Sequence, residues 1–225
     1  MRPIDRLFNS MLGDAVPTEY VSDGLIFQID GILDQSIIPQ TIVAVGMENK
    51  PFTEYRGTVA RNSANNGWYF DGATCLQVQG NTEAVNYATS TIEIVFKDYD
   101  GFTKNRFLFG TGRSDGNNII AGIGAPSKFV YTPVLSMPSY EMQATTDIVA
   151  VSASSAIGML NGEPLTASES RGFSRWGVVS LGGRPNTDGY DFYGEIYALR
   201  VYDRQLSVSE VMNNQRLDML RFNIQ

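Results

Sequence analysis

The stretch that decides the fold is Phe192-Tyr193-Gly194-Glu195-Ile196-Tyr197-Ala198-Leu199-Arg200-Val201-Tyr202-Asp203-Arg204-Gln205-Leu206-Ser207. Residues 192–202 are mainly aromatic and aliphatic, a composition that favours a β-strand. The character of the chain changes at Asp203-Arg204, where polar residues end the apolar run. We therefore expect a long strand that passes within a few residues into a C-terminal helix.

The residues after this strand predict a helix from about 208 to 220. Ser207 is followed three residues later by Glu210, the spacing of a capping box, in which each side chain bonds the backbone N–H of the other. Two stripes are open as the buried face of this helix. One consists of Val211, Gln215 and Asp218, and the other, which is more apolar, consists of Val208, Met212, Gln215 and Met219.

Upstream of the closing stretch, from residue 24 onward, the pattern is that of β-strands separated by turns. The expected strands are Leu25–Ile29, Trp68–Phe70, Leu76–Val78, Thr91–Lys97, Arg106–Phe109, Asn118–Ile123, Phe129–Thr132, Ile148–Val151, Ala156–Leu160, Val178–Leu181 and Phe192–Tyr202. Asp71-Gly72 and Asn161-Gly162 are typical hairpin turns. Short strands at this spacing, without long helices between them, predict an all-β fold, a two-sheet antiparallel β-sandwich.

Five fragments in the correct order carry a resemblance to a known family. They are Trp68-Tyr69-Phe70-Asp71-Gly72, Thr91-Ile92-Glu93-Ile94, Val149-Ala150-Val151 with Met159-Leu160-Asn161-Gly162-Glu163, Leu181-Gly182-Gly183, and residues 192–207. Together they resemble laminin G-like domains of the concanavalin A-like lectin and glucanase jelly-roll fold, over residues 24–216. The resemblance implies a β-sandwich with a short C-terminal helix. Tyr197 and Ala198 stand where the family usually has acidic residues.

The composition excludes several classes of function. The net charge is −7, from 24 acidic and 17 basic residues. An acidic chain without a basic cluster has no footprint for nucleic acid, and no apolar run is long enough for membrane insertion. The sequence contains no histidine and one cysteine, Cys75, which excludes Ser-His and Cys-His nucleophile pairs and zinc sites that use histidine. Cys75 fits a buried apolar position in a strand.

The first residues form a pattern of their own. Apolar residues recur at helical spacing, at Ile4, Leu7, Phe8, Met11 and Leu12. We interpret residues 1–16 as an N-terminal amphipathic helix for docking or oligomerisation, and residues 17–225 as the sandwich domain. Two alternatives stay open, namely that the segment packs on its own domain and that it is a frayed tail.

The catalytic branch of the resembled family places its two carboxylates on one strand, in the spacing Glu-x-Asp-x-x-Glu, so that both face one side. This chain has no such motif, and Glu93 stands alone between Ile92 and Ile94. We therefore expect a protein that is not an enzyme, with glycoside hydrolysis as the weakest alternative.

Two sets of residues are candidate sites. Oxygen ligands for Ca²⁺ could come from two loops, at Asp98, Asp100, Asn105, Asp188 and Asp191. The alternative for these residues is turn chemistry, and no other cofactor is expected. Aromatic residues in loops or at strand ends could stack on sugars, and the candidates are Tyr131, Tyr140, Phe173, Trp176 and Tyr190. A place in the core is the alternative for each of them.

The functional hypothesis joins these observations. Residues 1–9 lack the apolar core of a secretory signal, whereas domains of the resembled family mostly act on extracellular partners or glycans. We therefore expect a bacteriophage virion component, which lysis would release without a secretory signal. It could be a capsid decoration, fibre or tail-associated protein. The expected partners are other virion or surface proteins, bound through residues 1–16, copies of the same chain in a homo-oligomer, and glycans. The alternative is a free carbohydrate-binding module or cell-surface adhesin, with or without calcium.

Overall fold

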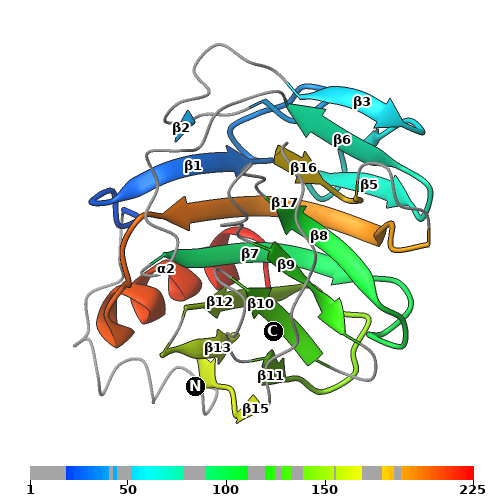
Figure 1. The fold of residues 1–225 in the computed structure, drawn as a ribbon. Coiled ribbons are helices and arrows are strands. Elements are labelled where there is room, and N and C mark those ends of the chain that lie inside the picture. The colour runs from blue at the N-terminus through cyan, green and yellow to red at the C-terminus, as the bar shows by residue number, and fades with distance from the viewer. Residues whose placement is uncertain are drawn as a thin grey trace, which may run out of the picture.

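The computed structural model describes residues 19–40, 43–44, 52–78, 90–110, 120–124, 128–132, 139–154, 156–168, 179–184 and 189–225. The expected N-terminal helix, with Ile4, Leu7, Phe8, Met11 and Leu12, lies outside these residues, so the boundary at residue 16 stays a prediction. Within the described residues the chain forms two stacked antiparallel sheets and one helix (Figure 1). This confirms the predicted all-β sandwich with a C-terminal helix.

The first sheet has nine strands in the order β14-β13-β12-β7-β17-β1-β2, with β5 and β4 continuing beside the N-terminal half of β17. Its strands are β1 (Leu25–Asp30), β2 (Val43–Ala44), β4 (Ala60–Asn62), β5 (Gly67–Asp71), β7 (Thr91–Asp98), β12 (Val149–Ala153), β13 (Gly158–Leu160), β14 (Glu163–Pro164) and β17 (Tyr193–Tyr202). The long strand expected at the end of the chain is β17, and it lies at the centre of this sheet.

The second sheet has eight strands in the order β15-β11-β10-β9-β8-β16-β6-β3. They are β3 (Thr53–Arg56), β6 (Cys75–Val78), β8 (Arg106–Gly110), β9 (Ile120–Gly124), β10 (Lys128–Thr132), β11 (Ser139–Glu141), β15 (Ala167–Ser168) and β16 (Val179–Leu181). One large apolar cluster fills the space between the sheets. Ile92, Ile94 and Phe96 alternate into it from β7, as predicted, and Trp68 is fully buried there.

The two predicted hairpin turns have different outcomes. Asn161 and Gly162 both have positive φ angles and join the paired strands β13 and β14, so this hairpin is confirmed. The prediction for Asp71-Gly72 is wrong, because β5 belongs to the first sheet and β6 to the second. Both strands send apolar side chains, such as Phe70 and Leu76, into the same core from opposite sides. The turn therefore crosses between the layers instead of pairing its two strands.

The C-terminal helix α2 (Val208–Arg221) covers part of the outer face of the first sheet. Its capping box, Ser207 with Glu210, is present as predicted. All three residues of the more polar stripe, Val211, Gln215 and Asp218, are buried, and so is Met212 of the apolar stripe, while Val208 is 48% exposed. No helix in the described parts of the chain is long and apolar enough to cross a bilayer.

A β-bulge in the middle of β17 decides what the outer face presents. The register against β7 shifts between Ile196 and Ala198, so that Tyr197 is the extra residue. Before the bulge Ile196 enters the core, and after it Leu199 and Val201 do so. Residues 193, 195 and 197 therefore share the outer face with residues 198, 200 and 202. Tyr197 and Ala198 pack against Phe222 at the end of α2, whereas Tyr193 lies at the start of the strand.

Candidate functional site

Of the five aromatic residues singled out from the sequence, the structure describes the side chains of two, Tyr140 and Tyr190. Tyr140 on β11 is 2% exposed, and its hydroxyl donates to the carbonyl oxygen of Ser154 over 2.7 Å. Tyr190 is 40% exposed and lies in the turn before β17. Tyr131 occupies a position in β10, and Phe173 and Trp176 lie outside the described residues.

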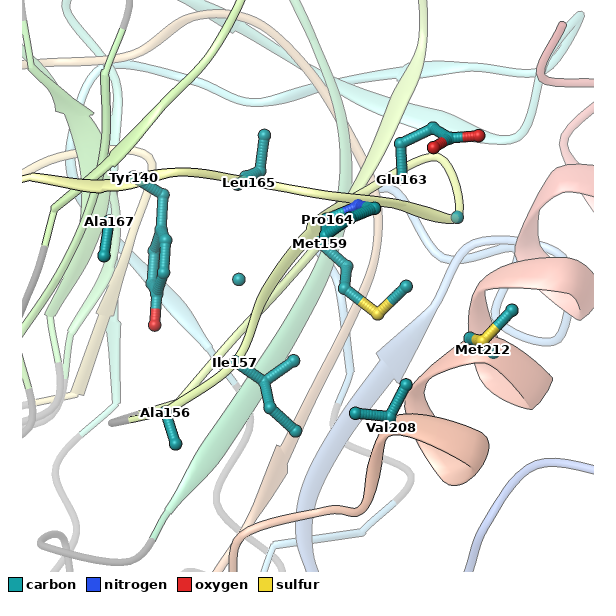
Figure 2. Close-up of a pocket in the computed structure, with 12 residues that line it drawn as sticks. Tyr140, Ala156, Ile157, Met159, Glu163, Pro164, Leu165, Ala167, Val208 and Met212 are labelled. Carbon is teal, nitrogen blue, oxygen red and sulfur yellow. The ribbon is translucent and has the colours of Figure 1, made fainter.

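Tyr140 does line a cavity of about 500 Å³ at one edge of the sandwich. Figure 2 shows its ring on one side of the cavity and Val208 and Met212 of α2 on the other, with Met159 of β13 between them. The lining is apolar except at Glu163, whose carboxylate points away from the other side chains in Figure 2. Such a surface can accept apolar groups but offers little to orient a polar ligand.

The first of the two acidic loops expected to hold calcium is organised by its own hydrogen bonds. Oδ2 of Asp98 accepts from the backbone N–H of Phe102 over 2.6 Å, and Oδ1 accepts from that of Asp100. Burial raises the pKa of Asp98, while these two hydrogen bonds act in the opposite direction. Asp100 pairs with Arg106 and Lys104, and the hydrogen bond from Arg106 lowers the pKa of Asp100.

In the second loop, Asp191 pairs with Arg56, with Nη2 and Oδ1 2.5 Å apart. Asp188 of this second loop lies outside the described residues. Asn105, which belongs to the first loop, has an interaction partner as well. Within the part of the chain that the structure describes, no group of three or more acidic, cysteine or histidine side chains is gathered as metal ligands would be. Asp98, Asp100 and Asp191 instead bind arginines and backbone N–H groups. Calcium binding at these loops stays a prediction.

A different group of aromatic residues does come together, on the outer face of the first sheet at the end that α2 does not cover. It consists of Tyr69 on β5, Tyr99 just after β7 and Tyr193 at the start of β17, and we call it the tyrosine patch. Each of the three is partly exposed. The backbone N–H of Tyr99 donates to the carbonyl oxygen of Tyr193 over 3.0 Å, which fixes these two residues side by side.

The three rings contact one another at different angles. The centroids of Tyr99 and Tyr193 are 5.4 Å apart with the planes at 86°, and those of Tyr69 and Tyr99 are 6.0 Å apart at 34°. Tyr69 and Tyr193 complete the group at 6.4 Å. The ammonium group of Lys97 lies 5.5 Å from the centroid of Tyr99, a cation–π distance. The patch therefore combines three partly exposed aromatic rings with one cation.

Behind the patch lies a buried carboxylate, Glu195, which is 1% exposed. Nδ2 of Asn62 donates to Oε1 over 2.5 Å and Nδ2 of Asn65 donates to Oε2 over 2.8 Å. The hydroxyl of Tyr197 donates to Oε2, and the hydroxyl of Tyr99 is also bonded to this carboxylate. Burial acts to raise the pKa of Glu195, but these hydrogen bonds outweigh it and the pKa is lowered. Glu195 is thus a buried anion at neutral pH.

The buried carboxylate of Glu195 accepts a hydrogen bond from Tyr99 and so fixes this member of the patch. Burial, followed by the charge and the hydrogen bond of Glu195, raises the pKa of Tyr99 to about 12. Gly67 makes room for this arrangement, because a Cβ atom at this position would lie 2.8 Å from Cε1 of Tyr197. Ordered tyrosines lose little side-chain freedom on binding and combine an apolar face with a polar edge. The patch can therefore stack on a sugar ring and hydrogen-bond its hydroxyl groups.

These three tyrosines were not among the predicted site residues, although the alternation of residues in β5 indicates that Tyr69 faces outward. Tyr69 alternates with Trp68 and Phe70 in β5, and both neighbours enter the core, so Tyr69 must face outward. Tyr193 sits in the quoted closing stretch, which we interpreted only as a strand. Tyr99 could not be placed, because its position depends on how β7 and β17 pair.

Glu93 and Glu195, two buried glutamates of the first sheet, are both held by other residues. Glu93 is 1% exposed and lies beneath α2, where it pairs with Arg200 over 3.0 Å. Glu195 is enclosed by the hydrogen-bond donors of Asn62, Asn65, Tyr197 and Tyr99. Most glycosidases use a carboxylic acid and a second carboxylate on either side of the scissile bond, although sialidases use a tyrosine nucleophile. Neither of these two buried carboxylates is placed for that role.

The chain matches no family model and no curated relative. Solved structures share its fold at low identity. Trypanosoma rangeli sialidase in complex with sialic acid aligns with a TM-score of 0.58 and 13% identity, over 93% of this chain and 35% of that chain. The receptor-binding domain of a botulinum neurotoxin C/D mosaic serotype aligns with a TM-score of 0.59 and 10% identity, over 89% of this chain and 52% of that one.

A third similar structure is that of botulinum neurotoxin type C, with a TM-score of 0.58 and 10% identity over 86% of this chain and 51% of that chain. Cell entry of that toxin is dependent upon interaction with two ganglioside molecules. This chain spans between 35% and 52% of the length of these three structures. At such identities the likeness establishes a β-sandwich fold and leaves function to be argued from the site.

Proposed function

We propose that this chain is a non-enzymatic, glycan-binding β-sandwich of the laminin G-like type, and that the tyrosine patch is its binding surface. One observation carries the proposal. Three partly exposed tyrosines meet on the end of the sheet that α2 leaves uncovered, and one of them, Tyr99, is bonded to the buried carboxylate of Glu195. Ring faces at several angles, with fixed hydroxyl groups, suit a pyranose that has one apolar face and a polar rim.

The fold comparisons support the same class of ligand without identifying it. One similar structure contains sialic acid, and another belongs to a toxin whose cell entry depends on gangliosides. Both are sugar-containing ligands of proteins that share this sandwich at about one tenth identity. Glycan binding is therefore proposed for this chain because of the residues of its tyrosine patch, and the comparisons support it.

A glycan array, followed by calorimetric titration of the best ligand, tests the proposal. Tyr99→Ala removes the ring at the centre of the patch, and we expect it to weaken binding about tenfold or more, the loss typical of a central aromatic contact. Tyr99→Phe keeps the ring and loses only the hydroxyl, so it should retain a larger share of the affinity. Tyr193→Ala should weaken binding as Tyr99→Ala does.

The matched control is Tyr190→Ala, because Tyr190 is an exposed tyrosine outside the patch. It should leave affinity unchanged. Loss of binding in Tyr190→Ala, with Tyr99→Ala unaffected, would transfer the site to the loop residues that the sequence suggested. An array without any specific binder would reject glycan binding altogether. Melting temperatures of all variants show whether each change in affinity has a cause other than unfolding.

The absence of catalysis is part of the proposal and needs its own measurement. Reducing-sugar release from β-glucans and sialic acid release from sialyllactose should both stay at the level of the buffer. Turnover that disappears in Glu195→Gln or Glu93→Gln would overturn this part, because those are the buried carboxylates closest to the described site and to the family motif.

A bacteriophage virion is the setting that we propose for this domain, and a cell surface is the alternative. Domains of the resembled family mostly act on extracellular partners or glycans, which a particle released by lysis would reach. Proteomic analysis of particles purified after lysis of the producing cells tests it. We expect the chain to copurify with capsid or tail proteins, and its recovery only in the cell envelope would instead favour an adhesin.

A further inference from the structure

The apolar cavity beside α2 has no role in glycan binding as proposed above. It lies between the edge strands β13 and β14 and the first turns of α2. Val208 of α2 is 48% exposed, and Met159, Met212 and the ring of Tyr140 also line the cavity (Figure 2). An apolar surface of this kind costs free energy when water covers it. The cavity is therefore suited to an apolar group of a partner or of this chain.

The path of the chain brings one candidate to this place. The described residues begin at Glu19, whose carbonyl oxygen accepts a hydrogen bond from Nδ2 of Asn213 over 3.0 Å. The backbone N–H of Val21 donates to Oδ1 of Asn214 over 2.9 Å. Asn213 directly follows Met212, which lines the cavity. The chain thus meets α2 in the same turn that carries Met212.

The length of the preceding segment is sufficient for it to reach the cavity. Eighteen residues come before Glu19. Residues 13–18 alone span up to about 20 Å when extended, at roughly 3.3–3.6 Å per residue. A helix has a diameter of about 10 Å, so this length is enough to pass over α2. Residues 4–12 can therefore reach the cavity of their own chain.

The chemistry of the two surfaces also agrees. Residues 4–12 carry five apolar side chains at helical spacing, with Leu7 and Phe8 in the middle. A helix this short is marginal in water unless its apolar face is buried. We propose that residues 4–12 bind in the cavity of the same chain, with Leu7 and Phe8 against Val208 and Met212. This intramolecular docking is independent of the proposed glycan site.

Trypsin provides a direct test on the full chain, because Arg6 lies within the segment. Cleavage between Arg6 and Leu7 should be slow in the wild-type protein if the segment is docked. Val208→Asp places a charge at the cavity margin and should accelerate this cleavage tenfold or more, as followed by intact mass spectrometry. Val208 is the first residue of α2, where an acidic side chain favours the helix, so the variant should stay folded.

Ser209→Asp is the matched control, since it adds the same charge in the same turn at an exposed residue that does not line the cavity. It should leave the cleavage rate as in the wild type. Equal rates in the wild type, Val208→Asp and Ser209→Asp would overturn the proposal. A change of rate that appears in both variants equally would overturn it as well, because it would reflect charge rather than contact.

An engineered cysteine pair distinguishes the same chain from a neighbouring copy. Phe8→Cys combined with Val208→Cys should oxidise to an intramolecular disulfide, whereas Asn9→Cys with Val208→Cys, on the polar side of the segment, should not. Cys75 is fully buried, so it should not compete. A disulfide-linked dimer in place of the monomer would contradict docking within one chain and favour exchange between copies. Absence of any disulfide would count against the cavity as the docking site.

Discussion

Arg200 on β17 donates from Nε to Oε2 of Glu93 on β7 over 3.0 Å, and both side chains are almost completely inaccessible to solvent. The same guanidinium also pairs with Asp218 of α2. One buried cation therefore joins two adjacent strands to the helix that covers them. Nδ2 of Asn214 donates to Oε2 of Glu93 over 2.9 Å, and the ring of Tyr20 lies 4.0 Å from the Arg200 guanidinium carbon.

Replacement of Arg200 by Met should be the most damaging single change in this network. It leaves Glu93 and Asp218 buried without their cation, a situation that typically costs about 3–5 kcal/mol. Urea unfolding measures the loss. Arg204→Met serves as control, because Arg204 pairs with Asp23 and Glu210 while 29% of its side chain is exposed, and such pairs contribute about 1 kcal/mol or less. Equal losses in the two variants would contradict the assigned role of Arg200.

The stability of the protein should depend on pH through Glu93. Burial raises the pKa of Glu93 to about 6, against 4.5 for an exposed glutamate, even though Arg200 acts in the opposite direction. The folded state therefore holds this proton more tightly than the unfolded state. Protonated Glu93 therefore stabilises the folded state by on the order of 1–2 kcal/mol below about pH 4.5, and this stabilisation is lost as the pH rises through about 6.

Glu93→Gln should remove most of this dependence between pH 4.5 and 6, as followed by urea unfolding at several pH values. The control variant is Glu210→Gln. Hydrogen bonds from Arg204 lower the pKa of Glu210 to about 2, so the stabilisation by Glu210 is present above about pH 4.5 and lost as the pH falls towards 2. We expect the two glutamates to change the free energy of unfolding with pH in opposite directions, Glu93 between pH 4.5 and 6 and Glu210 between pH 2 and 4.5. An unchanged pH profile of stability in Glu93→Gln would contradict the role assigned to Glu93.

This buried network also explains why the strand faces could be predicted from the sequence but the buried face of α2 could not. Alternation in β7 was enough to place Ile92, Ile94 and Phe96 in the core. The face of α2 could not be chosen by hydrophobicity, because the helix buries Gln215 and Asp218 against polar groups on the sheet. Nε2 of Gln215, for example, donates to Oγ of Ser152 over 2.9 Å. Such a partner is visible only once the strand order is known.

The tyrosine patch was hidden for a similar reason. Its members come from β5, the end of β7 and the start of β17, which are far apart in sequence and adjacent only through the pairing of Glu195 with Tyr69 and Lys97. The bulge at Tyr197 also changes which residues face outward in the second half of β17. Periodicity alone assumes an unbroken alternation, so it cannot reveal an insertion of one residue.

Glu195→Gln tests whether the buried carboxylate organises the patch. The amide would direct an N–H group at donors such as Asn65 and Tyr197, which leaves buried polar groups unpaired at a cost of about 1–3 kcal/mol. We expect lower stability in urea together with weaker glycan binding. Glu163→Gln is the control, because Glu163 is exposed, and it should change neither property. A fall in stability with full binding affinity would separate the carboxylate from ligand recognition.

Calcium provides the last test, because the sequence offered a calcium site and the described loops hold its carboxylates with other partners. Arg106 neutralises Asp100 and Arg56 neutralises Asp191, so an incoming Ca²⁺ would have to displace a guanidinium from either carboxylate. We therefore expect millimolar CaCl₂ or EDTA to shift the melting temperature by less than about 1 °C, against the several degrees that about 1 kcal/mol of binding free energy produces. A larger shift that disappears in Asp100→Asn would contradict this expectation and support a calcium-dependent adhesin, because binding would then depend on a carboxylate of the predicted loop. A shift that persists in Asp100→Asn but disappears in Asp188→Asn would instead place the ion at the second loop.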